Sequence, residues 1–255
     1  MSAQKRTPVK REPRKEKIVE HTLTSSKVES VSSRNSDNFR LELKDIQKPI
    51  VNLHRENDIT ILLASPGNGK DFMQIYRAMS GLINKEFEEV IFMRTILEAT
   101  SSKIGYLPGN EDSKFEPYLE IFYEQMKSML KPTVFERLKN KVRFEYPGFA
   151  RGKSFGGNHK GNVCIILSEA QNCELRELVL ISTRLSEGSK LYINSDPNQS
   201  DIGNRSGILP FINIVKDIEG IHVEELGEEF QMRGRLVQEI DNNYRKYLNK
   251  NLHSK

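Results

Sequence analysis

Cysteine is scarce in this chain of 255 residues, which contains only Cys164 and Cys173. Their spacing matches no metal-binding motif, and Cys164 lies inside a strongly apolar strand pattern, so we expect it to be a small buried side chain. Long hydrophobic runs are also missing, which excludes a helix of about 20 apolar residues that crosses a membrane. The first residues lack the apolar core of a secretory signal. These absences predict a reducing, intracellular setting, namely the cytoplasm, and no membrane partner.

Apolar residues make up only 36% of the chain, so part of its length is expected to be tail. The net charge of +4 is concentrated at the start, because residues 1–20 carry seven Lys or Arg and three Glu while the remainder is neutral. We therefore predict a disordered basic tail over 1–37, one domain with a real core over 38–241, and a second basic tail over 242–255. The first tail could bind a phosphate backbone, although composition favours a solvated arm.

The most informative stretch is Ala64–Asp71, which reads ASPGNGKD. It follows the apolar run Ile59–Leu63 and precedes a helical pattern that begins at Phe72. Strand, Gly-rich loop, Lys and helix is the arrangement with which P-loop proteins bind phosphates, through backbone N–H groups and a helix N-terminus. Lys70 is expected to reach the β- and γ-phosphates. The candidate nucleotide-binding residues are Ser65, Pro66, Gly67, Asn68, Gly69, Lys70 and Asp71.

Short apolar segments recur along the chain and alternate with helical patterns. Short strands that alternate with helices predict an α/β fold, here the parallel sheet of a P-loop NTPase flanked by helices. Val163–Leu167 is typical of a central parallel strand, whereas Val142–Tyr146 alternates and predicts a hairpin strand after a turn at Pro132. The other predicted strands are Val90–Met93, Leu191–Ile193 and Gly220–Leu226, and the predicted helices are Phe115–Leu130 and Leu175–Leu185. Leu41–Leu53 is interpreted as a short amphipathic lead-in, and 236–248 as a final basic helix or tail.

Ser168 and Glu169 come directly after the central strand. In a P-loop protein a carboxylate at this point holds the magnesium ion, and the next acid orients the attacking water. The simpler alternative is a helix start capped by Ser168. Together with the phosphate loop, the pattern favours the catalytic interpretation of Glu169. Gln199, in the loop after the next strand, is expected to sense the γ-phosphate, unless this loop is only a polar turn.

Four arginines lie at or near the ends of predicted elements. An isolated Arg is usually a surface charge, but at the carboxyl edge of a parallel sheet it can stabilise a transferring phosphoryl group. Two loops that combine aromatic and basic residues suit stacking on single-stranded bases, although ordinary loop packing explains each of them alone. Tyr106, Arg151 and Lys153 are the nucleic-acid candidates. The four arginines are Arg94, Arg151, Arg184 and Arg233.

Taken in order, these segments resemble the PhoH family of P-loop ATPases over roughly residues 40–240. The order of many such sequence blocks along the chain is more specific evidence for one family than a single phosphate loop is. The resemblance implies a core related to superfamily 1 helicases, ATP or ADP with Mg²⁺ as ligands, RNA or single-stranded DNA as partner, and in some members a hexameric ring; such proteins are common in bacteria and phages. The blocks are ASPGNGKD, IFMRTILEA, IGYLPG, ARGKSF, IILSEAQN, LISTRLSEGSKLYINSDPNQSD, SGI and EFQMRGRLV.

The resemblance implies roles for the residues that the chain keeps. Lys70 would hold the phosphates, Glu169 would activate water, Gln199 would sense the γ-phosphate and Arg233 would stabilise the transition state. The implied function is an ATPase coupled to remodelling of RNA or single-stranded nucleic acid, with weakened hydrolysis; the alternative is a non-hydrolysing nucleotide- or nucleic-acid-binding scaffold or regulator. The chain departs from the family pattern at Ala64, Asp71, Ser168, Ser195 and Phe230.

Two of these departures concern the metal. The family has a hydroxyl after the phosphate-loop Lys and a carboxylate at the end of the central strand, whereas this chain has Asp71 and Ser168. The two groups have exchanged positions, so the formal charge is unchanged. Either oxygen type can ligate Mg²⁺, which predicts a rearranged metal site made by Asp71 and Ser168. Plain decay of a catalytic site is the competing interpretation.

Overall fold

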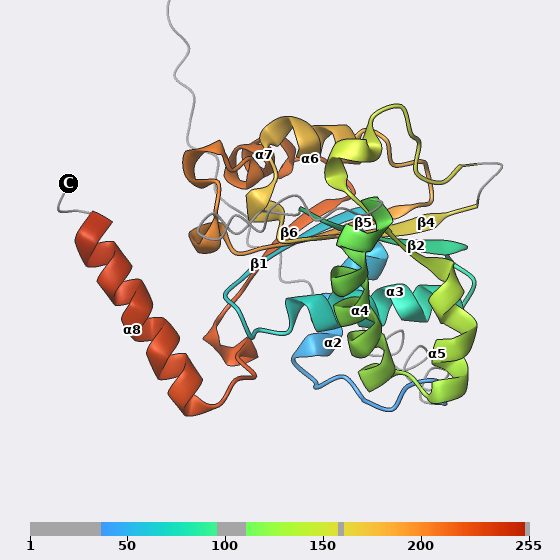
Figure 1. Ribbon diagram of the computed structural model, residues 1–255, viewed down its shortest axis with the longest axis horizontal. Coiled ribbons are helices and arrows are strands. Elements are labelled where there is room, and N and C mark those ends of the chain that lie inside the picture. The colour runs from blue at the N-terminus through green and yellow to red at the C-terminus, as the bar shows by residue number, and fades with distance from the viewer. Residues whose placement is uncertain (1–36, 96–110, 158–160, 253–255) are drawn as a thin grey trace, which may run out of the picture. The chain divides into compact units, whose positions relative to one another are not determined.

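A computed structural model describes residues 37–95, 111–157 and 161–252. Six strands form one sheet in the order β3-β2-β4-β5-β1-β6, and every neighbouring pair is parallel (Figure 1). The strands are β1 (Ile59–Ala64), β2 (Glu89–Arg94), β3 (Val142–Glu145), β4 (Val163–Ser168), β5 (Lys190–Ser195) and β6 (Ile221–Leu226). The helices are α2 (Gln47–Glu56), α3 (Lys70–Ile83), α4 (Glu111–Met129), α5 (Pro132–Leu138), α6 (Leu175–Ser182), α7 (Ile208–Val215) and α8 (Arg235–Leu252).

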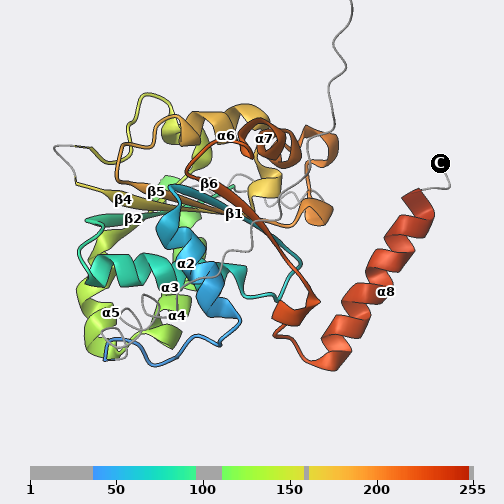
Figure 2. The ribbon, with the colours of Figure 1, turned by 180° about the vertical axis from the view of Figure 1, so that it is seen from behind.

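Helices cover both faces of the sheet. Helices α2 to α5 lie on one face and α6 and α7 on the other, as the two opposite views show (Figures 1 and 2). Successive side chains of a strand point to opposite faces, so Cys164 and Ile166 of β4 enter the first core while Ile165 and Leu167 enter the second. The predicted α/β sheet, with Val163–Leu167 as a central strand, is confirmed.

The carboxyl ends of the central strands meet at one edge of the sheet. Leu63 near the end of β1 pairs with Ser195, the last residue of β5, and Arg94 of β2 pairs with Ser168 of β4. Strand β5 therefore lies between the strand of the phosphate loop and the strand that ends at Ser168. Ligands of open parallel sheets bind at this edge, so the fold brings the candidate site residues of several segments to one place.

Three local expectations are corrected. Val142–Glu145 is not a hairpin strand, because β3 pairs in parallel with β2 and is reached through the crossover helices α4 and α5. Pro132 does not only make a turn, since it is a first-turn residue of α5, where its missing N–H costs nothing. Helix α7 was not predicted. The spacing of Ile208, Phe211 and Val215, which are all buried, was the available signal.

Further expectations concern the ends of the domain, the two cysteines and membrane spans. Of the two alternatives for 236–248, helix or tail, the structure shows a helix, and the 18 residues of α8 extend across position 241. The predicted boundaries after 37 and 241 stay predictions. Cys164 and Cys173 are both buried free thiols, as expected for Cys164. Within the described ranges, no helix is long and apolar enough to cross a membrane.

Candidate nucleotide site

The phosphate loop joins β1 to α3 and contains two glycines in a left-handed backbone conformation. Gly67 has φ of +89° and Gly69 has φ of +73°, a region that favours glycine. Gly69 precedes the first residue of α3, and no side chain caps that end of the helix. The backbone N–H groups of the first turn are therefore open to an anion. Lys70 begins the helix and is only 7% exposed.

A segment from the far end of the chain holds this loop. The segment 227–233, which we call the clamp, follows β6. The Met232 amide donates to the Gly67 carbonyl at 2.9 Å, and the Gln231 side chain donates to the Pro66 carbonyl at 3.1 Å. Asn68 completes the contact with Nδ2, which donates to the Leu226 and Gly227 carbonyls at 3.2 and 3.0 Å. The clamp thus fixes three successive loop residues.

The clamp also brings Arg233 to the loop. A Cβ added to Gly67 would lie 2.7 Å from side-chain carbons of Arg233 and 2.4 Å from Oε1 of Gln231. Gly67 is therefore needed for close approach as well as for its backbone angle. Arg233 itself is exposed, so its guanidinium is accessible to a ligand beside the loop. Phe230, where the family has an Asp, is instead buried among Ile50, Leu226 and their neighbours.

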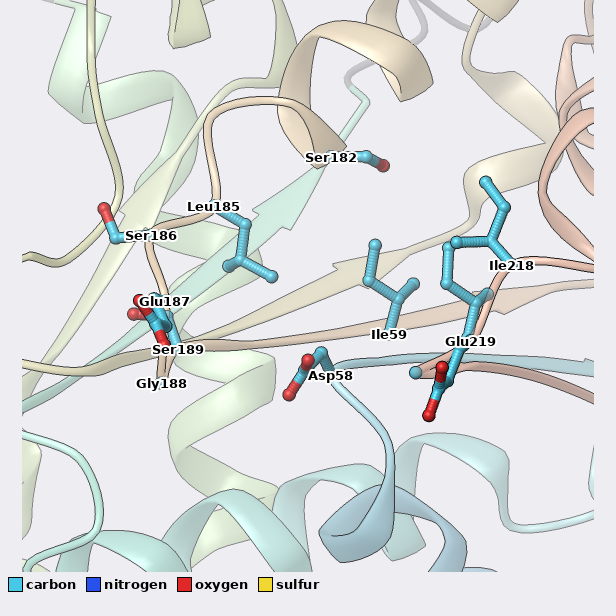
Figure 3. Close-up of a pocket in the computed structure, with 12 residues that line it drawn as sticks. Asp58, Ile59, Ser182, Leu185, Ser186, Glu187, Gly188, Ser189, Ile218 and Glu219 are labelled. Atoms are coloured by element: carbon cyan, nitrogen blue, oxygen red, sulfur yellow. The ribbon is translucent and has the colours of Figure 1, made fainter.

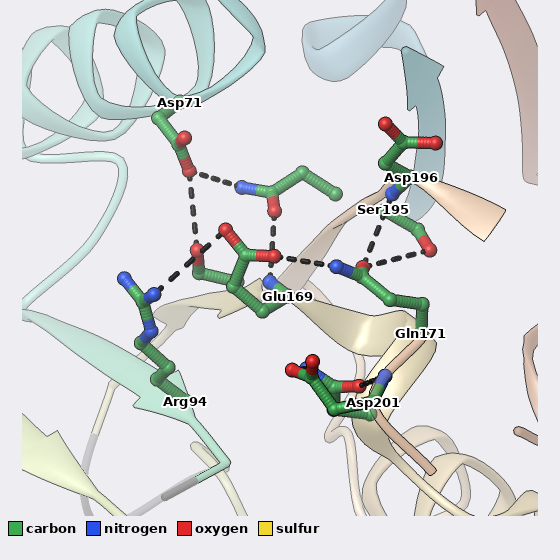
Figure 4. A network of polar contacts seen from close by, with 10 residues as sticks. Asp71, Arg94, Glu169, Gln171, Ser195, Asp196 and Asp201 are labelled. Atoms are coloured by element: carbon green, nitrogen blue, oxygen red, sulfur yellow. Dashed lines mark hydrogen bonds and ion pairs between the residues drawn. The ribbon is translucent and has the colours of Figure 1, made fainter. Parts of the chain in front are cut away.

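Asp71 and Ser168, which the sequence predicts as the metal site, are in contact. Ser168 Oγ donates to Asp71 Oδ1 at 3.2 Å, and Nδ2 of Asn194 donates to the same oxygen (Figure 4). Burial raises the pKa of Asp71 and the nearby Glu169 carboxylate adds to this, whereas Lys70 and the two donors oppose it. The interpretation of Ser168 as a helix cap is wrong, because Glu174 caps α6 in a reciprocal contact with Glu177.

Glu169 is held in an unusual backbone conformation. Its φ and ψ are 57° and 42°, a left-handed geometry that costs a non-glycine residue about 1–3 kcal/mol. Its amide donates to Oδ1 of Asn194 at 3.0 Å, and its Oε2 accepts from Nε2 of Gln171 at 2.5 Å. Arg94 Nη2 lies 3.8 Å from Glu169 Oε1, and the same guanidinium stacks over the Tyr118 ring at 5.3 Å. The carboxylate is therefore oriented from two sides (Figure 4).

Gln171 joins Glu169 to the loop after β5. Its Oε1 accepts from Ser195 Oγ at 3.2 Å and from the Asp196 amide at 3.1 Å. Asp196 caps the short helix Pro197–Gln199 by accepting from the Asn198 amide, which is the geometry of the expected polar turn. Gln199 is exposed in that turn. Its expected role at the γ-phosphate stays a prediction.

Sequence reasoning missed several residues of this network. Asn194 and Gln171 carry most of its hydrogen bonds, and Gln74 supports Asn194 by accepting from its Nδ2 at 3.2 Å. All three are almost fully buried. The available signal was an amide in an otherwise apolar strand or helix, because a buried polar side chain needs partners. Gln231 of the clamp gave no such local signal.

The nucleic-acid candidates lie in different surroundings. Arg151 is exposed in the turn after the short helix Pro147–Ala150. Lys153 Nζ is paired with the buried carboxylate of Glu145, which Arg143 also contacts, so much of its charge is already neutralised. Tyr106 lies outside the described residues. Binding of nucleic acid by these residues stays a prediction.

The donor set fits a magnesium–nucleotide complex. Asp71 and Ser168 offer a carboxylate and a hydroxyl oxygen next to the phosphate loop. No cluster of three or more His, Cys, Asp or Glu residues that could bind a metal occurs among the described residues. Mg²⁺ bound with a nucleotide needs no such cluster, since it takes one or two carboxylates together with phosphate oxygens and water.

Fold and site together define a P-loop nucleotide-binding domain. Residues 42–245 match the family model described as PhoH-like protein, so the chain belongs to the PhoH-like family. Such domains bind a nucleoside triphosphate, usually with Mg²⁺. The family and fold predicted from the sequence are thus confirmed.

Several relatives and one solved structure are similar to parts of the chain. A PhoH-like protein of Mycobacterium tuberculosis is 32% identical over 205 residues, which cover 79% of this chain and 56% of the relative. That of Bacillus subtilis is 30% identical over 226 residues (87% and 69%), and Protein PhoH of Escherichia coli is 28% identical over 183 residues (68% and 49%). The chain thus spans little more than half the length of the mycobacterial relative. The crystal structure of the Pyrococcus furiosus Hef helicase domain aligns with a TM-score of 0.43 at 13% identity, over 72% of this chain and 38% of that one.

Proposed function

We propose that this protein binds ATP or ADP with Mg²⁺ and is an ATPase core with weakened hydrolysis, acting on RNA or single-stranded DNA. One observation carries the proposal. The carboxylate and hydroxyl expected at the metal are both present, in exchanged positions, and they contact each other at 3.2 Å beside the phosphate loop. If the two groups had changed independently, nothing would keep them in contact. Their contact therefore supports a working magnesium site.

In this proposal, each site residue at the carboxyl edge of the sheet has a chemical role. When bound, the magnesium–nucleotide supplies the phosphoryl group and offsets its charge. Lys70 and the open N–H groups of α3 bind the phosphates, and Asp71 and Ser168 provide metal-ligand oxygens. Glu169, oriented by Gln171, accepts a proton from the attacking water. Arg233 stabilises negative charge on the transferring group, and Gln199 senses the γ-phosphate.

A second candidate function is a non-hydrolysing scaffold or regulator that binds the nucleotide without turnover. The contact between Arg94 and Glu169 favours it, because the guanidinium 3.8 Å from Oε1 holds the carboxylate that would otherwise contact the attacking water. The departures at Ala64, Ser195 and Phe230 also favour it. Ser195 is fully buried and bonded to Gln171, which leaves its side chain no contact with a phosphate.

Turnover by the purified full chain distinguishes the two candidates. ATP hydrolysis is measured with and without RNA and single-stranded DNA, in the wild type and in Glu169→Gln, with nucleotide binding measured on the same samples. The ATPase proposal expects slow turnover that single strands stimulate and that Glu169→Gln removes while binding persists. Binding without turnover selects the scaffold. Absence of nucleotide binding contradicts both candidates.

The basic tail gives a test of the nucleic-acid partner. If the seven basic residues of 1–20 contact phosphates, deleting 1–20 weakens binding of a single strand and flattens its salt dependence. Each lost contact reduces the slope of log K against log salt by roughly 0.7. Deletion of 21–36, with two basic residues and one acidic residue, is the matched control. An unchanged slope after deletion of 1–20 means that this tail is only a solvated arm.

A further inference from the structure

Met232 differs from the other methionines that the structure describes. It lies in the clamp, and its side chain is 38% exposed. The others are completely buried in the cores of the domain. They are Met73, Met79, Met93, Met126 and Met129. Because a peroxide must reach the sulfur of a thioether to oxidise it, Met232 is the methionine of the described ranges that is open to oxidation.

The two cysteines of the chain do not compete with Met232 for an oxidant. Cys164 and Cys173 are both buried in the cores. Burial raises the pKa of each thiol, so neither forms the thiolate that reacts with a peroxide. In the described part of the chain, the first sulfur that a peroxide meets is therefore the thioether of Met232.

The Met232 side chain joins two segments that hold the phosphate loop from opposite sides. The clamp is bonded through the Met232 amide to the Gly67 carbonyl at 2.9 Å. The turn 44–47 at the start of α2 places Nε2 of Gln47 3.5 Å from a Cβ built on Gly69. In this turn the Lys44 amide donates to Oε1 of Gln47 at 3.0 Å. Lys44 Nζ donates to Met232 Sδ at 3.0 Å, a contact that we call the bridge.

Oxidation changes the acceptor of the bridge. The sulfur attacks one oxygen of hydrogen peroxide, an S–O bond forms as the O–O bond breaks, and the departing hydroxide takes the proton of the transferred oxygen and leaves as water. The thioether is oxidised to a sulfoxide and the peroxide is reduced. A thioether is a weak acceptor, whereas an ammonium and an oxygen form a strong hydrogen bond. Lys44 is exposed, so its side chain can move to make room for this oxygen.

We propose that Met232 is a site of reversible oxidation by hydrogen peroxide, and that its sulfoxide strengthens the bridge to Lys44 across the phosphate loop. A loop that is held more firmly on both sides opens less often, so oxidation slows the release of a bound nucleotide. The effect on release rests on the proposed nucleotide binding, whereas the oxidation and the stronger bridge do not. Reduction of the sulfoxide by methionine sulfoxide reductases reverses the change.

Graded treatment of the full chain with hydrogen peroxide tests the proposal. Peptide mapping by mass spectrometry should find the sulfoxide of Met232 before that of any buried methionine. Hydrogen exchange of the backbone amides of 67–70, measured without nucleotide, should slow on oxidation. Release of a labelled nucleotide should slow by about fivefold, the factor for a hydrogen bond that is stronger by about 1 kcal/mol. Treatment with methionine sulfoxide reductases should restore both rates.

Two variants separate the sulfur from the bridge. Met232→Leu keeps a similar volume without the sulfur, so neither loop exchange nor nucleotide release should respond to peroxide. Lys44→Ala should still be oxidised at Met232 but without slower release, because the sulfoxide oxygen has lost its donor. Lys131→Ala, which removes an exposed lysine elsewhere, is the matched control and should respond to peroxide as the wild type does.

An introduced methionine controls for the oxidation of an exposed sulfur as such. Ile218 is 50% exposed and lines a hollow where β1 and β6 begin, at the opposite edge of the sheet from the phosphate loop (Figure 3). A strand of six residues separates the two edges by about 20 Å. Ile218→Met combined with Met232→Leu should be oxidised at position 218 without any change in nucleotide release.

Several outcomes overturn the inference. Oxidation of a buried methionine before Met232 does so, as does a Met232 sulfoxide that leaves loop exchange or nucleotide release unchanged or makes either of them faster. Slower release after oxidation of Lys44→Ala, or of the variant with the introduced methionine, also overturns it, because the bridge is then not the cause. Failure of the untreated wild type to bind nucleotide contradicts the proposed function, and loop exchange alone then decides the inference.

Discussion

The carboxyl edge of the sheet has two halves that are built in different ways. The phosphate half consists of Gly67, Gly69, Lys70 and the clamp, and it relies on backbone angles, backbone carbonyls and one buried amine. The metal half consists of side chains that bond to one another, from Asp71 and Ser168 through Asn194 to Glu169 and Gln171. The metal half contains Asp71 and Ser168, the two positions at which the resemblance to the family implies an exchange of groups.

Hydrogen bonding in the two halves bears on whether the metal site has decayed or has been rearranged. A decayed polar site is expected to leave buried atoms without partners, because nothing maintains their complements. Among the described residues, the buried side-chain atoms that lack a partner include Oδ1 of Asn68 in the phosphate loop, but none in the metal half as defined above. We therefore propose exchange rather than decay for the metal half. The following predictions test this contrast.

Removal of Lys70 should give the largest effect, confined to the phosphate half. Lys70→Ala deletes the buried amine that binds the phosphates in the proposed function, and hydrogen bonds to charged groups are worth about 1.5–3 kcal/mol. Nucleotide affinity should therefore fall by roughly 10- to 150-fold with little change in folding. Titration of a labelled nucleotide measures this effect, with the exposed Lys131→Ala as control. Equal affinity in Lys70→Ala and wild type would place the nucleotide elsewhere.

Removal of Gln171 should instead reduce stability, because the metal half is a bonded network. Gln171→Leu leaves Ser195 Oγ and the Asp196 amide without their buried acceptor, which costs about 1–3 kcal/mol in the free energy of unfolding. Gln199→Leu is the matched control, since Gln199 is exposed in the adjoining turn and should leave stability unchanged. Urea unfolding measures both variants. Equal stability of the two variants would show that the network is not structural.

A double-mutant cycle tests the exchange itself. Asp71→Thr and Ser168→Asp should each weaken binding of magnesium–ATP, because each leaves the site with two hydroxyls or two carboxylates. The double variant restores the family arrangement and should bind at least as well as the wild type. The coupling energy is expected to be about 0.5–3 kcal/mol. Effects that simply add would mean that the two positions changed independently and that the site has decayed.

The pH dependence of stability gives the smallest and most specific effect. The raised pKa of Asp71 means that the folded protein binds this proton more tightly than the unfolded chain does. The resulting stabilisation is complete below the ordinary value of 3.8 and is lost as pH rises through the raised pKa. Asp71→Asn should therefore gain stability relative to the wild type over this window. Urea unfolding without Mg²⁺ or nucleotide tests this, with the exposed Asp217→Asn as control; a constant difference between Asp71→Asn and wild type refutes it.

The sequence by itself determined the fold class, most strand positions and the phosphate loop. These features depend on local patterns, such as the apolar run Val163–Leu167 or glycines and a lysine at fixed spacing before a helix. The direction of β3 did not follow from its own residues, because alternation is the same in parallel and antiparallel strands. Only the path of the chain through α4 and α5 decided it.

The tertiary structure decided how the site is held together. Asp71 meets Ser168 and Asn194 across 97 and 123 residues of chain, and the clamp reaches Pro66 across 165. No periodicity within one segment encodes such contacts, because they depend on the order in which strands lie side by side. The sequence therefore predicted that Asp71 and Ser168 form one site, and the fold showed that these two side chains touch.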